Sequence, residues 1–290
     1  MARLLRSFLF VPGNNPKFIE KAKTLGADVI CLDLEDSVPA KDKETARQLI
    51  SEAVRTRPES MREVYVRTNS FDSGLVEDEI RAVVHKGIDG IVIPKVNDPG
   101  EVHQASQWIT ELESKRGIRK YSIEVMPSIE SARGVVNAYS IASASPRVSA
   151  LVFGVFDFLL DMGLEYLEDG IEYSYARAKV PVDARAAGVY AIDSIWQKID
   201  DTEGLIRDAS AGMRLGYKGK SIIHPSQIEH VHRIFLPGRE EVEWARKVAH
   251  ALSDAMEKGK GAINLEGKMI DAVHYKRAKA LLDVAGESTK

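Results

Sequence analysis

The stretch DVICLDLED, residues 28–36, joins an almost continuously apolar run to a cluster of acids. Continuous apolar character is typical of strands covered on both faces, as the strands of parallel sheets are. Eight β-rich runs recur along the chain with helical patterns between them: residues 6–11, 28–34, 63–69, 90–94, 121–127, 150–154, 188–193 and 220–224. This alternation predicts an α/β fold, a closed (β/α)8 TIM barrel, for which a chain of 290 residues is long enough.

Two further observations complete the predicted organisation. A doubly wound open sheet is the alternative to the barrel, but it usually has fewer strands, and no G-x-G-x-x-G follows any of the runs. The residues after the eighth unit are typical of a helix, a glycine-rich turn and a second helix. We therefore expect a barrel domain at residues 1–236 and a C-terminal helical extension at residues 237–290.

The composition of the chain limits the classes of partner that it can be expected to bind. The chain has 40 basic and 43 acidic residues and a net charge of −3, which gives no basic footprint for nucleic acid or an anionic membrane. No segment approaches the ~18 consecutive apolar residues of a membrane span. The apolar run at the N-terminus stops at Pro12 and Gly13, so it is interpreted as a first strand rather than a signal peptide. With the single cysteine Cys31, these features predict a cytoplasmic protein that binds small molecules or copies of itself.

Charged and polar residues follow the apolar runs with regularity. They are Asp33, Glu35, Asp36, Arg67, Asn69, Lys95, Glu130, Asp157, Asp193 and His224. Active sites of such barrels lie at the C-terminal ends of the strands, so these residues are expected at one rim. Any one of them has the ordinary alternative of a polar loop or a helix cap. As a group they imply opposite charges or a metal, because charges in a barrel mouth are costly to desolvate.

Glu130 and Asp157 form a candidate metal pair, because they follow consecutive strands and have no histidine or cysteine beside them in the sequence. Two carboxylates with open positions suit a hard cation such as Mg²⁺. Arg67 is the candidate partner for a substrate carboxylate, which its planar guanidinium can bind through two hydrogen bonds. An ion pair of Arg67 with Glu35 or Asp36 is the alternative.

Nine blocks of the sequence, in order, carry a resemblance to a known family. They are RSFLFVPGNNPKFIEKA, ADVICLDLEDSV, VYVRTN, GIVIPKV, MPSIESARGV, LVFGVFDF, ARAAGVYAID, GYKGKSIIHPSQI and LEGKMIDA. Together they resemble the HpcH/HpaI aldolase and citrate lyase β-subunit-like family, which includes malyl-CoA, citramalyl-CoA and citryl-CoA lyases. The resemblance extends from about residue 5 to residue 283.

The resemblance implies roles for particular residues. The family's metal carboxylates match Glu130 and Asp157, and its substrate-binding arginine matches Arg67. A C-terminal lid, supplied by a neighbouring subunit of a trimer, carries a catalytic aspartate that matches Asp271. The resemblance further implies that Glu35 and Asp36 orient Arg67 or metal-bound water. It also implies that Lys17 and Pro225 lie on the side of the site that binds coenzyme A.

The implied activity is that of a Mg²⁺-dependent lyase, with Mn²⁺ as an alternative ion. It would reversibly cleave a carboxylated 3-hydroxyacyl-CoA of the malyl-, citramalyl- or citryl-CoA type to acetyl-CoA and a 2-oxoacid. A homotrimer or hexamer is expected. The alternatives are a thioesterase that hydrolyses the same CoA ester and the β subunit of a citrate lyase complex. Complex-type subunits are expected to lack a closely matching C-terminal segment, so the tail of this chain argues against the latter.

Overall fold

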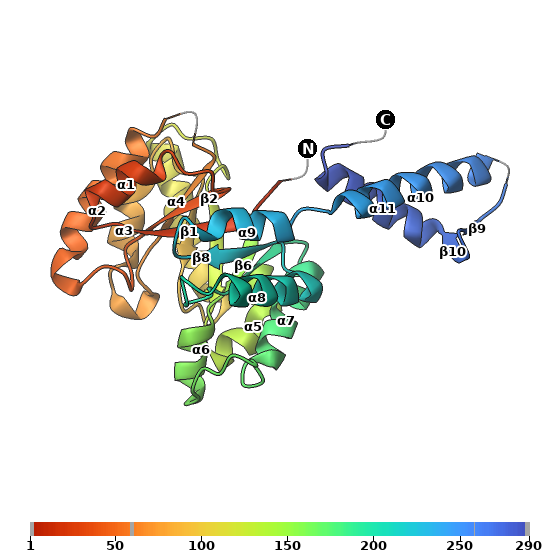
Figure 1. Cartoon of the computed structure of the whole chain (residues 1–290). Coiled ribbons are helices and arrows are strands. Elements are labelled where there is room, and N and C mark those ends of the chain that lie inside the picture. The colour runs from red at the N-terminus through yellow and green to blue at the C-terminus, as the bar shows by residue number, and fades with distance from the viewer. Residues whose placement is uncertain (1–2, 59–60, 258, 288–290) are drawn as a thin grey trace. The chain divides into compact units, whose positions relative to one another are not determined.

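The computed structural model describes residues 3–58, 61–257 and 259–287. Within them, eight parallel strands close into a barrel in sequence order (Figure 1). The bounds are β1 Ser7–Pro12, β2 Val29–Asp33, β3 Glu63–Arg67, β4 Gly90–Ile93, β5 Glu124–Ile129, β6 Ala150–Phe153, β7 Tyr190–Asp193 and β8 Gly219–Ile222. Each strand overlaps one of the predicted runs. The predicted (β/α)8 barrel is therefore confirmed.

The barrel is filled by apolar side chains. A buried cluster contains Leu5, Phe8, Val29, Cys31, Tyr65, Val92, Met126, Ala150, Val152 and Ile192. Cys31 lies in this cluster with no exposed surface. The strand register determines which residues lie at the C-terminal end of the barrel. Asp33 at the end of β2 is the Cα partner of both Pro12 on β1 and Arg67 on β3. The ends of the first three strands are therefore level, and their last side chains meet at one rim.

Helices follow the strands and surround the barrel (Figure 1). They are α1 Pro16–Ala22, α2 Lys43–Arg55, α3 Val76–Val83, α4 Pro99–Lys115, α5 Ala132–Ala142, α6 Val155–Met162, α7 Ser174–Ala186, α8 Thr202–Leu215 and α9 Gln227–Ile234. Asn15 and Ser131 cap α1 and α5 through side-chain oxygens, which accept the first free N–H groups of each helix. The helix α8 ends at Gly216, whose φ of 110° is typical of a glycine that follows a helix.

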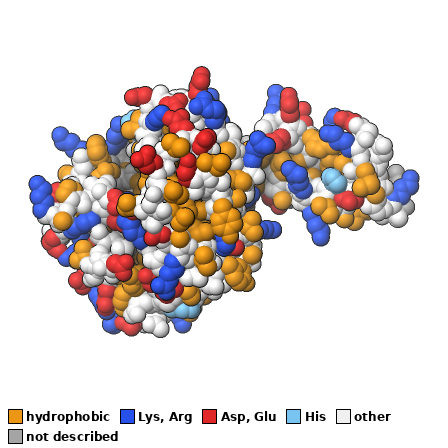
Figure 2. All heavy atoms as spheres, turned by 90° about the horizontal axis from the view of Figure 1, so that it is seen from below, with side chains coloured by type: hydrophobic (Ala, Val, Ile, Leu, Met, Phe, Trp, Pro, Cys, Tyr) orange, Lys and Arg blue, Asp and Glu red, His pale blue; other side chains and the backbone are white. Residues whose placement is uncertain are grey.

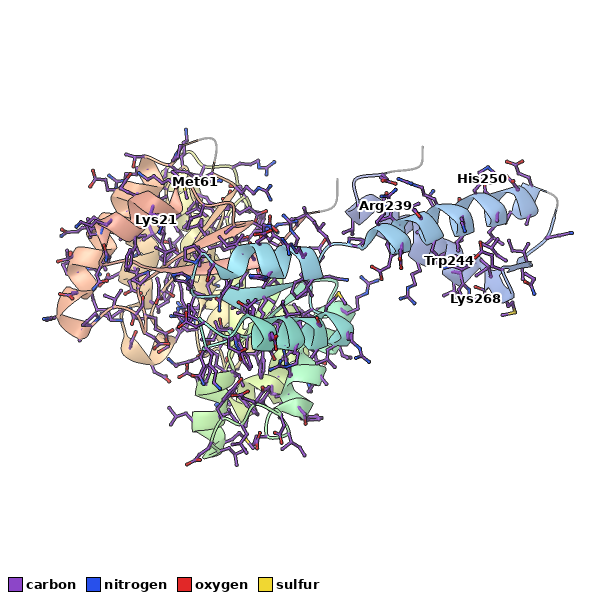
Figure 3. The ribbon with its side chains drawn as sticks, viewed as in Figure 1. Lys21, Met61, Arg239, Trp244, His250 and Lys268 are labelled. Carbon is purple, nitrogen blue, oxygen red and sulfur yellow. The ribbon has the colours of Figure 1, made fainter. Side chains whose placement is uncertain are left out.

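The C-terminal segment contains α10 Arg239–Glu257, β9 Ala262–Leu265, β10 Lys268–Asp271 and α11 Ala272–Val284. The predicted glycine-rich turn between two helices is wrong, because residues 262–271 form an antiparallel hairpin in which Leu265 pairs with Lys268. Glu266 and Gly267 connect the strands with φ values of 51° and 82°, as the two-residue turn that fits strand twist requires. Lys268 lies over the ring of Trp244, with Nζ 4.9 Å from the ring centroid (Figure 3).

Contacts divide the chain into two compact units. One is Leu5–His232, and the other is built mainly from Arg233 onward. The second unit has its own apolar core, in which Leu252, Ile270 and Leu282 are buried. The boundary predicted between residues 236 and 237 stays a prediction. Within the described ranges, no helix combines the length and the apolar character needed to cross a membrane.

Candidate active site

A cavity of about 400 Å³ opens at the C-terminal ends of the barrel strands. Its lining includes Phe10, Asp33, Arg67, Glu130, Asp157 and Ser194. These residues lie in or directly after five strands, β1, β2, β3, β5 and β7, and in α6. We call this space the barrel cavity. Five of the ten rim residues named from the sequence line it: Asp33, Asp36, Arg67, Glu130 and Asp157.

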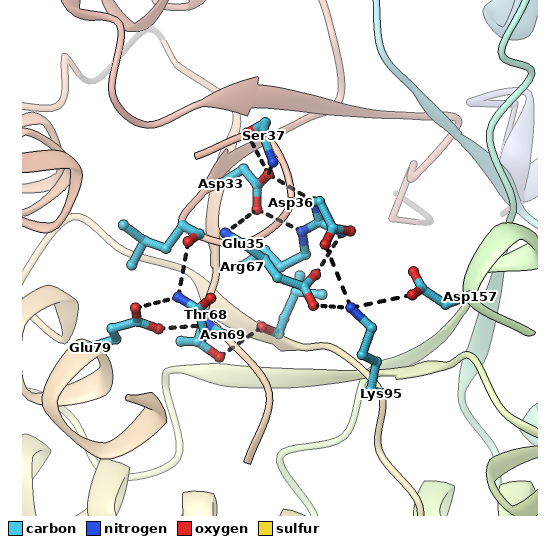
Figure 4. Close-up of polar contacts among 12 residues, drawn as sticks. Asp33, Glu35, Asp36, Ser37, Arg67, Thr68, Asn69, Glu79, Lys95 and Asp157 are labelled. Atoms are coloured by element: carbon cyan, nitrogen blue, oxygen red, sulfur yellow. Dashed lines mark hydrogen bonds and ion pairs between the residues drawn. The ribbon is translucent and has the colours of Figure 1, made fainter. Parts of the chain in front are cut away.

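Arg67 lies at the centre of the polar contacts (Figure 4). Its Nε and Nη2 bind the two carboxylate oxygens of Asp33 at 2.7 and 2.8 Å. Nη1 lies 3.0 Å from Glu35 Oε2 and 3.5 Å from Asp36 Oδ2. The guanidinium carbon also lies 4.7 Å from the centroid of the Phe10 ring. The ion pair with Glu35 and Asp36, which was the alternative to a substrate partner, is thus present. The sequence named Asp33 as a rim residue but not as the partner of Arg67, with which it makes the two-fold contact.

The charges of Arg67 and Asp33 stabilise each other. Burial alone would lower the pKa of Arg67, but Asp33, and after it Glu35 and Glu130, raise that pKa well above its ordinary value. Burial would likewise raise the pKa of Asp33, but Arg67 holds it below the usual range. Arg67 is therefore a cation held in place, and Asp33 occupies the edge of the guanidinium group formed by Nε and Nη2. Nη1, and the second hydrogen of Nη2, are the donors that face other partners.

Glu35 bridges two cations. Its Oε2 lies against Arg67, and its Oε1 accepts a hydrogen bond of 2.5 Å from Lys95 Nζ. Burial raises the pKa of Glu35 to about 7, against the lowering effects of Arg67 and Lys95. The backbone that carries Glu35 is held by Lys43, whose Nζ donates to the carbonyl oxygens of Leu34 and Glu35 at 2.6 and 2.8 Å. The loop after β2 is therefore fixed from both sides.

Glu130 directly follows β5 and is nearly inaccessible to solvent. Its Oε2 is buried and has no hydrogen-bond partner in the structure. Burial, and then the charge of Glu35, raise the pKa of Glu130 to about 8; Arg67 opposes this effect and Asp157 adds to it. Gly154 allows the carboxylate its place, because a Cβ there would lie 2.7 Å from Glu130 Oε1. An unpartnered, buried carboxylate oxygen is costly unless another group binds it.

Asp157 lies in the first turn of α6, so it is on a helix rather than at a strand end. Its Oδ1 is 3.4 Å from Lys95 Nζ, and its side chain is 30% exposed. This partial exposure, beside the buried Glu130, fits a cation that would have both protein and solvent ligands. The described residues hold no group of three or more His, Cys, Asp or Glu side chains arranged for a metal. The two carboxylates therefore suit Mg²⁺, which takes few protein ligands and leaves positions for water and substrate.

Two rim residues named from the sequence have other surroundings. Asp193 is fully buried, and its carboxylate binds Arg177 at 2.5 Å and Lys220 at 3.2 Å. These cations hold the pKa of Asp193 below its ordinary value, although burial would raise it. His224 Nδ1 lies 2.8 Å from Ser226 Oγ. Neither side chain is among those that line the barrel cavity.

A second cavity of about 210 Å³ lies beside the first and shares Phe10, Pro12 and Ile223 with it. Pro225 lines this cavity, as do Phe18 and Lys21. Lys17 is exposed at the start of α1 and is absent from the lining. Lys21, one helical turn after Lys17, lines the cavity instead. The spacing of four residues on one helix face was the signal in the sequence for Lys21.

Asp271 belongs to the second unit, where it caps α11. Its Oδ1 accepts hydrogen bonds from the backbone N–H groups of Val273 and His274 at 3.0 and 3.3 Å. The His274 ring also lies 2.7 Å from this oxygen. The His274 side chain, and then its backbone N–H, lower the pKa of Asp271. The residue is therefore an exposed carboxylate that stays ionised at neutral pH.

Known proteins resemble the chain along most of its length. The family model described as HpcH/HpaI aldolase/citrate lyase matches residues 6–225. The citrate lyase subunit beta of Leuconostoc mesenteroides subsp. cremoris is 38% identical over 98% of this chain and 94% of its own length. Human mitochondrial citramalyl-CoA lyase is 32% identical over 97% of this chain and 85% of its own. The structure of protein CitE from Mycobacterium tuberculosis with magnesium, acetoacetate and coenzyme A superposes with a TM-score of 0.78 at 28% identity, covering 97% and 98% of the two chains.

These matches correct one expectation. A close match to the C-terminal segment was expected to be missing from the citrate lyase β subunits. The alignment with the Leuconostoc subunit covers 98% of this chain, so it includes most of the C-terminal segment. The presence of the tail therefore does not argue against the β subunit of a citrate lyase complex.

Proposed function

The chain belongs to the HpcH/HpaI aldolase/citrate lyase family, and we propose that the barrel cavity is where this Mg²⁺-dependent CoA-thioester lyase cleaves its substrate. The substrate is a carboxylated 3-hydroxyacyl-CoA of the malyl-, citramalyl- or citryl-CoA type, and the products are acetyl-CoA and a 2-oxoacid. The observation that supports this placement is the unpartnered, buried Oε2 of Glu130. It lies in the same cavity as Asp157 and Arg67.

Glu130 and Asp157 would hold the metal. When bound, Mg²⁺ supplies Lewis-acid polarisation of the carbonyl and neutralises negative charge on the substrate oxygens. Glu130 must ionise to bind it, because its pKa of about 8 leaves it mostly protonated at neutral pH. The partial exposure of Asp157 leaves room for substrate oxygens on the cavity side. Mn²⁺, which also prefers oxygen ligands, would serve as a substitute.

Arg67 would bind the substrate's charged oxygens. With Nε and Nη2 engaged by Asp33, the donors at Nη1 and the remaining Nη2 hydrogen would face the carboxylate or the oxygen that gains charge as the C–C bond breaks. Asp33 holds the guanidinium plane fixed, and Glu35 and Asp36 lie 3.0 and 3.5 Å from Nη1, beside the donors that would face the substrate. The orienting roles of Glu35 and Asp36 stay a prediction, to which the geometry adds Asp33 as the closest partner.

Proton transfer completes the reaction. In the cleavage direction the bond between the thioester α-carbon and the carbinol carbon breaks, the hydroxyl proton leaves, and the α-carbon gains a proton. We assign the proton on the α-carbon to Asp271, which the resemblance identifies as the lid aspartate. Its exposed position at the start of α11 leaves it accessible to a substrate. Its ionised form would remove the α-carbon proton in the condensation direction and, once protonated, would return it in cleavage. The second unit would then act as a lid that excludes water.

The second cavity would bind the coenzyme A part of the substrate. Its apolar residues Phe10, Phe18 and Pro225 suit the uncharged arm of the cofactor, and Lys21 suits a phosphate. Lys17, on the same helix, would contribute from outside the cavity. The shared residue Phe10 connects this cavity to the reaction site.

The enzyme is also proposed to be a homo-oligomer, a homotrimer or hexamer, built through an apolar face of the barrel. The residues concerned are Val136, Tyr139, Leu160, Ile171, Tyr175 and Val182, which are 50% to 77% exposed and lie on or next to α5, α6 and α7. Because α5 contacts both α6 and α7, we take them as one apolar face. Figure 2 shows apolar side chains gathered on the viewed side of the barrel. At roughly 150–250 Å² for a fully exposed large side chain, these fractions amount to on the order of 700 Å². One partner in a standard interface contributes ~800 Å², and monomers rarely expose a patch so large. A cytoplasmic location stays a prediction.

Product analysis distinguishes the proposed lyase from its alternatives. Purified protein with Mg²⁺ is incubated with malyl-CoA, citramalyl-CoA and citryl-CoA, and free 2-oxoacid and free CoA thiol are quantified separately. The proposal predicts oxoacid release without CoA thiol for at least one ester. CoA thiol without oxoacid would establish the thioesterase. The matches to citrate lyase β subunits give the second alternative specific support, and turnover of a carrier-protein thioester with none of the free CoA esters would establish it.

A further inference from the structure

Lys95 is an unusual residue beside the barrel cavity. It follows β4 by two positions and has φ 54°, a left-handed conformation that is unfavourable for any residue with a side chain. A glycine would adopt this conformation without strain. The position instead carries a long cationic side chain, and such strain is concentrated at functional sites.

The ammonium group of Lys95 joins carboxylates from two separate parts of the barrel (Figure 4). Nζ lies 2.5 Å from Glu35 Oε1 and 3.6 Å from Asp36 Oδ1, both in the loop after β2. It also lies 3.4 Å from Asp157 Oδ1, on α6. Burial would lower the pKa of Lys95, but Glu35, and after it Asp157, raise it above its ordinary value. Lys95 is thus a permanent cation at the carboxylate proposed to bind Mg²⁺.

The neighbouring charges show why a cation is needed there. Five carboxylates surround this part of the cavity: Asp33, Glu35, Asp36, Glu130 and Asp157. Arg67 has its closest contacts with Asp33 and Glu35, and within the described residues no ion pair joins it to Asp157. Lys95 is the cation that pairs with Asp157. Without a metal, Lys95 therefore offsets the negative charge of Asp157.

We propose that Lys95 is an internal counter-cation of the metal site, a positioning residue that holds Asp157 before Mg²⁺ binds and releases it when Mg²⁺ arrives. This proposal rests on the proposed function, in which Glu130 and Asp157 are the metal ligands. Like charges repel, so a retained ammonium weakens Mg²⁺ binding. Lys95 keeps its second contact, with Glu35, after it releases Asp157.

Through its contact with Glu35, Lys95 also affects how Arg67 can bind the substrate. Glu35 bridges Lys95 and Arg67, so Lys95 draws one carboxylate oxygen of Glu35 away from the arginine. Without Lys95, Glu35 is free to accept further hydrogen bonds from Arg67 and to occupy the donors offered to the substrate. Loss of the ammonium should therefore strengthen Mg²⁺ binding and weaken substrate binding. A purely structural role would weaken both.

The test is calorimetric titration of Mg²⁺ into metal-stripped protein, followed by substrate kinetics at saturating Mg²⁺. Lys95→Met should bind Mg²⁺ about tenfold or more tightly, as expected when a positive charge is removed near a divalent ion. Its KM for the CoA ester should rise. Lys95→Arg should retain Mg²⁺ affinity near that of the natural protein. Lys218→Met, which removes an exposed lysine of the same unit, controls for net charge and should change neither quantity.

Unchanged or weaker Mg²⁺ binding by Lys95→Met would overturn the proposal. Lys95→Gly provides a second variant should the methionine protein fail to fold, because glycine accepts the left-handed backbone. Asp157→Ala separates this inference from the function on which it rests. If Asp157→Ala binds Mg²⁺ normally, the proposed metal site is wrong, and the Lys95 proposal is overturned with it. If Asp157→Ala loses Mg²⁺ while Lys95→Met does not bind it more tightly, only the role of Lys95 is wrong.

Discussion

Glu130 and Asp157 differ in their surroundings. Glu130 is buried with an unpartnered oxygen, and Asp157 is partly exposed beside a lysine. The sequence could identify both acids from their positions after consecutive strands. It could not show that burial would keep Glu130 mostly protonated at neutral pH, because burial depends on Gly154 and the packing around it.

Mg²⁺ binding should release a proton from Glu130. Because the pKa of Glu130 is raised to about 8 in the metal-free protein, the folded state holds this proton at pH 7 and loses it as pH rises. Titration in buffers of different ionisation enthalpy should therefore detect release of roughly one proton at pH 7 and little at pH 9.5. Mg²⁺ affinity should increase between these values.

The same raised pKa has a consequence for stability. The folded state binds more protons than the unfolded state between the ordinary pKa of 4.5 and about 8, so the contribution of Glu130 to metal-free stability falls as pH rises through this window. Glu130→Gln, which cannot ionise, should remove both the proton release and this part of the pH dependence. Proton release that persists in Glu130→Gln would assign the proton to another group.

Arg67 is expected to tolerate no substitution by lysine. Arg67→Lys should lower kcat/KM by about 10²-fold or more, nearly as much as Arg67→Ala, because an ammonium cannot bind both oxygens of Asp33 and still face the substrate. Steady-state kinetics of both variants, with Mg²⁺ affinity as the control, measure this effect. Kinetics like those of the natural protein in Arg67→Lys would leave Arg67 with a purely structural ion pair.

The contact between Asp33 and Arg67 could not be predicted from the sequence. The cluster DLED contains three acids, and the sequence does not show which of them binds Arg67 through both carboxylate oxygens. The barrel register decides this, because Asp33 and Arg67 are Cα partners on neighbouring strands. A sequence can predict that strands are neighbours, but their register depends on the closure of the whole barrel.

At the scale of elements, the eight strands were predictable because each is a short apolar run. The C-terminal hairpin was not. The glycines between α10 and α11 indicated a turn, and the structure places a two-residue turn at Glu266 and Gly267. The sequence did not indicate that the residues on either side of this turn pair as the strands β9 and β10. The hairpin places Asp271 at the start of α11, where it has a capping role as well as its proposed catalytic role.

Asp271→Asn separates these two roles. Asparagine caps helices about as well as aspartate, so the melting temperature should change little. The proposed proton transfer requires a carboxylate, so kcat should fall by ~10²–10⁴-fold while Mg²⁺ and oxoacid binding persist. An active Asp271→Asn enzyme would remove the residue from the mechanism.

A mixing experiment tests whether the lid acts between subunits. Asp271→Asn and Arg67→Ala subunits, each inactive alone, should regain partial activity in mixed oligomers, because some sites then combine an intact barrel with an intact lid. No recovery in demonstrably mixed oligomers would mean that each lid acts on its own barrel.

At the scale of the whole molecule, the apolar face is expected to hold subunits together. Tyr175 and Val182 lie about two turns apart on α7 with outward side chains, while Val180 and Ala184 of the same helix face the barrel. Such a pattern in a sequence indicates a buried helix, but only the structure shows that one side lacks a cover. α6 connects this face to the active site, because it carries both Leu160 and Asp157.

Charge at the apolar face should break the oligomer. The double variant Tyr175→Glu/Val182→Glu should sediment as a monomer, with a circular dichroism spectrum like that of the natural protein. Lys218→Met, remote from the apolar face in sequence, is the matched surface control and should remain an oligomer. A natural protein that is itself monomeric, or a double variant that remains fully assembled, would exclude this face as the interface.

The central claim is that Glu130 and Asp157 together hold the Mg²⁺ on which C–C bond cleavage depends. The most direct measurement is oxoacid release by metal-stripped protein as Mg²⁺ is added back, compared among the natural protein, Glu130→Ala and Asp157→Ala. We expect no release without metal, full recovery with Mg²⁺ in the natural protein, and no recovery in either variant although both remain folded. Full activity in the metal-stripped natural protein, or recovery by Mg²⁺ in either variant, would contradict it.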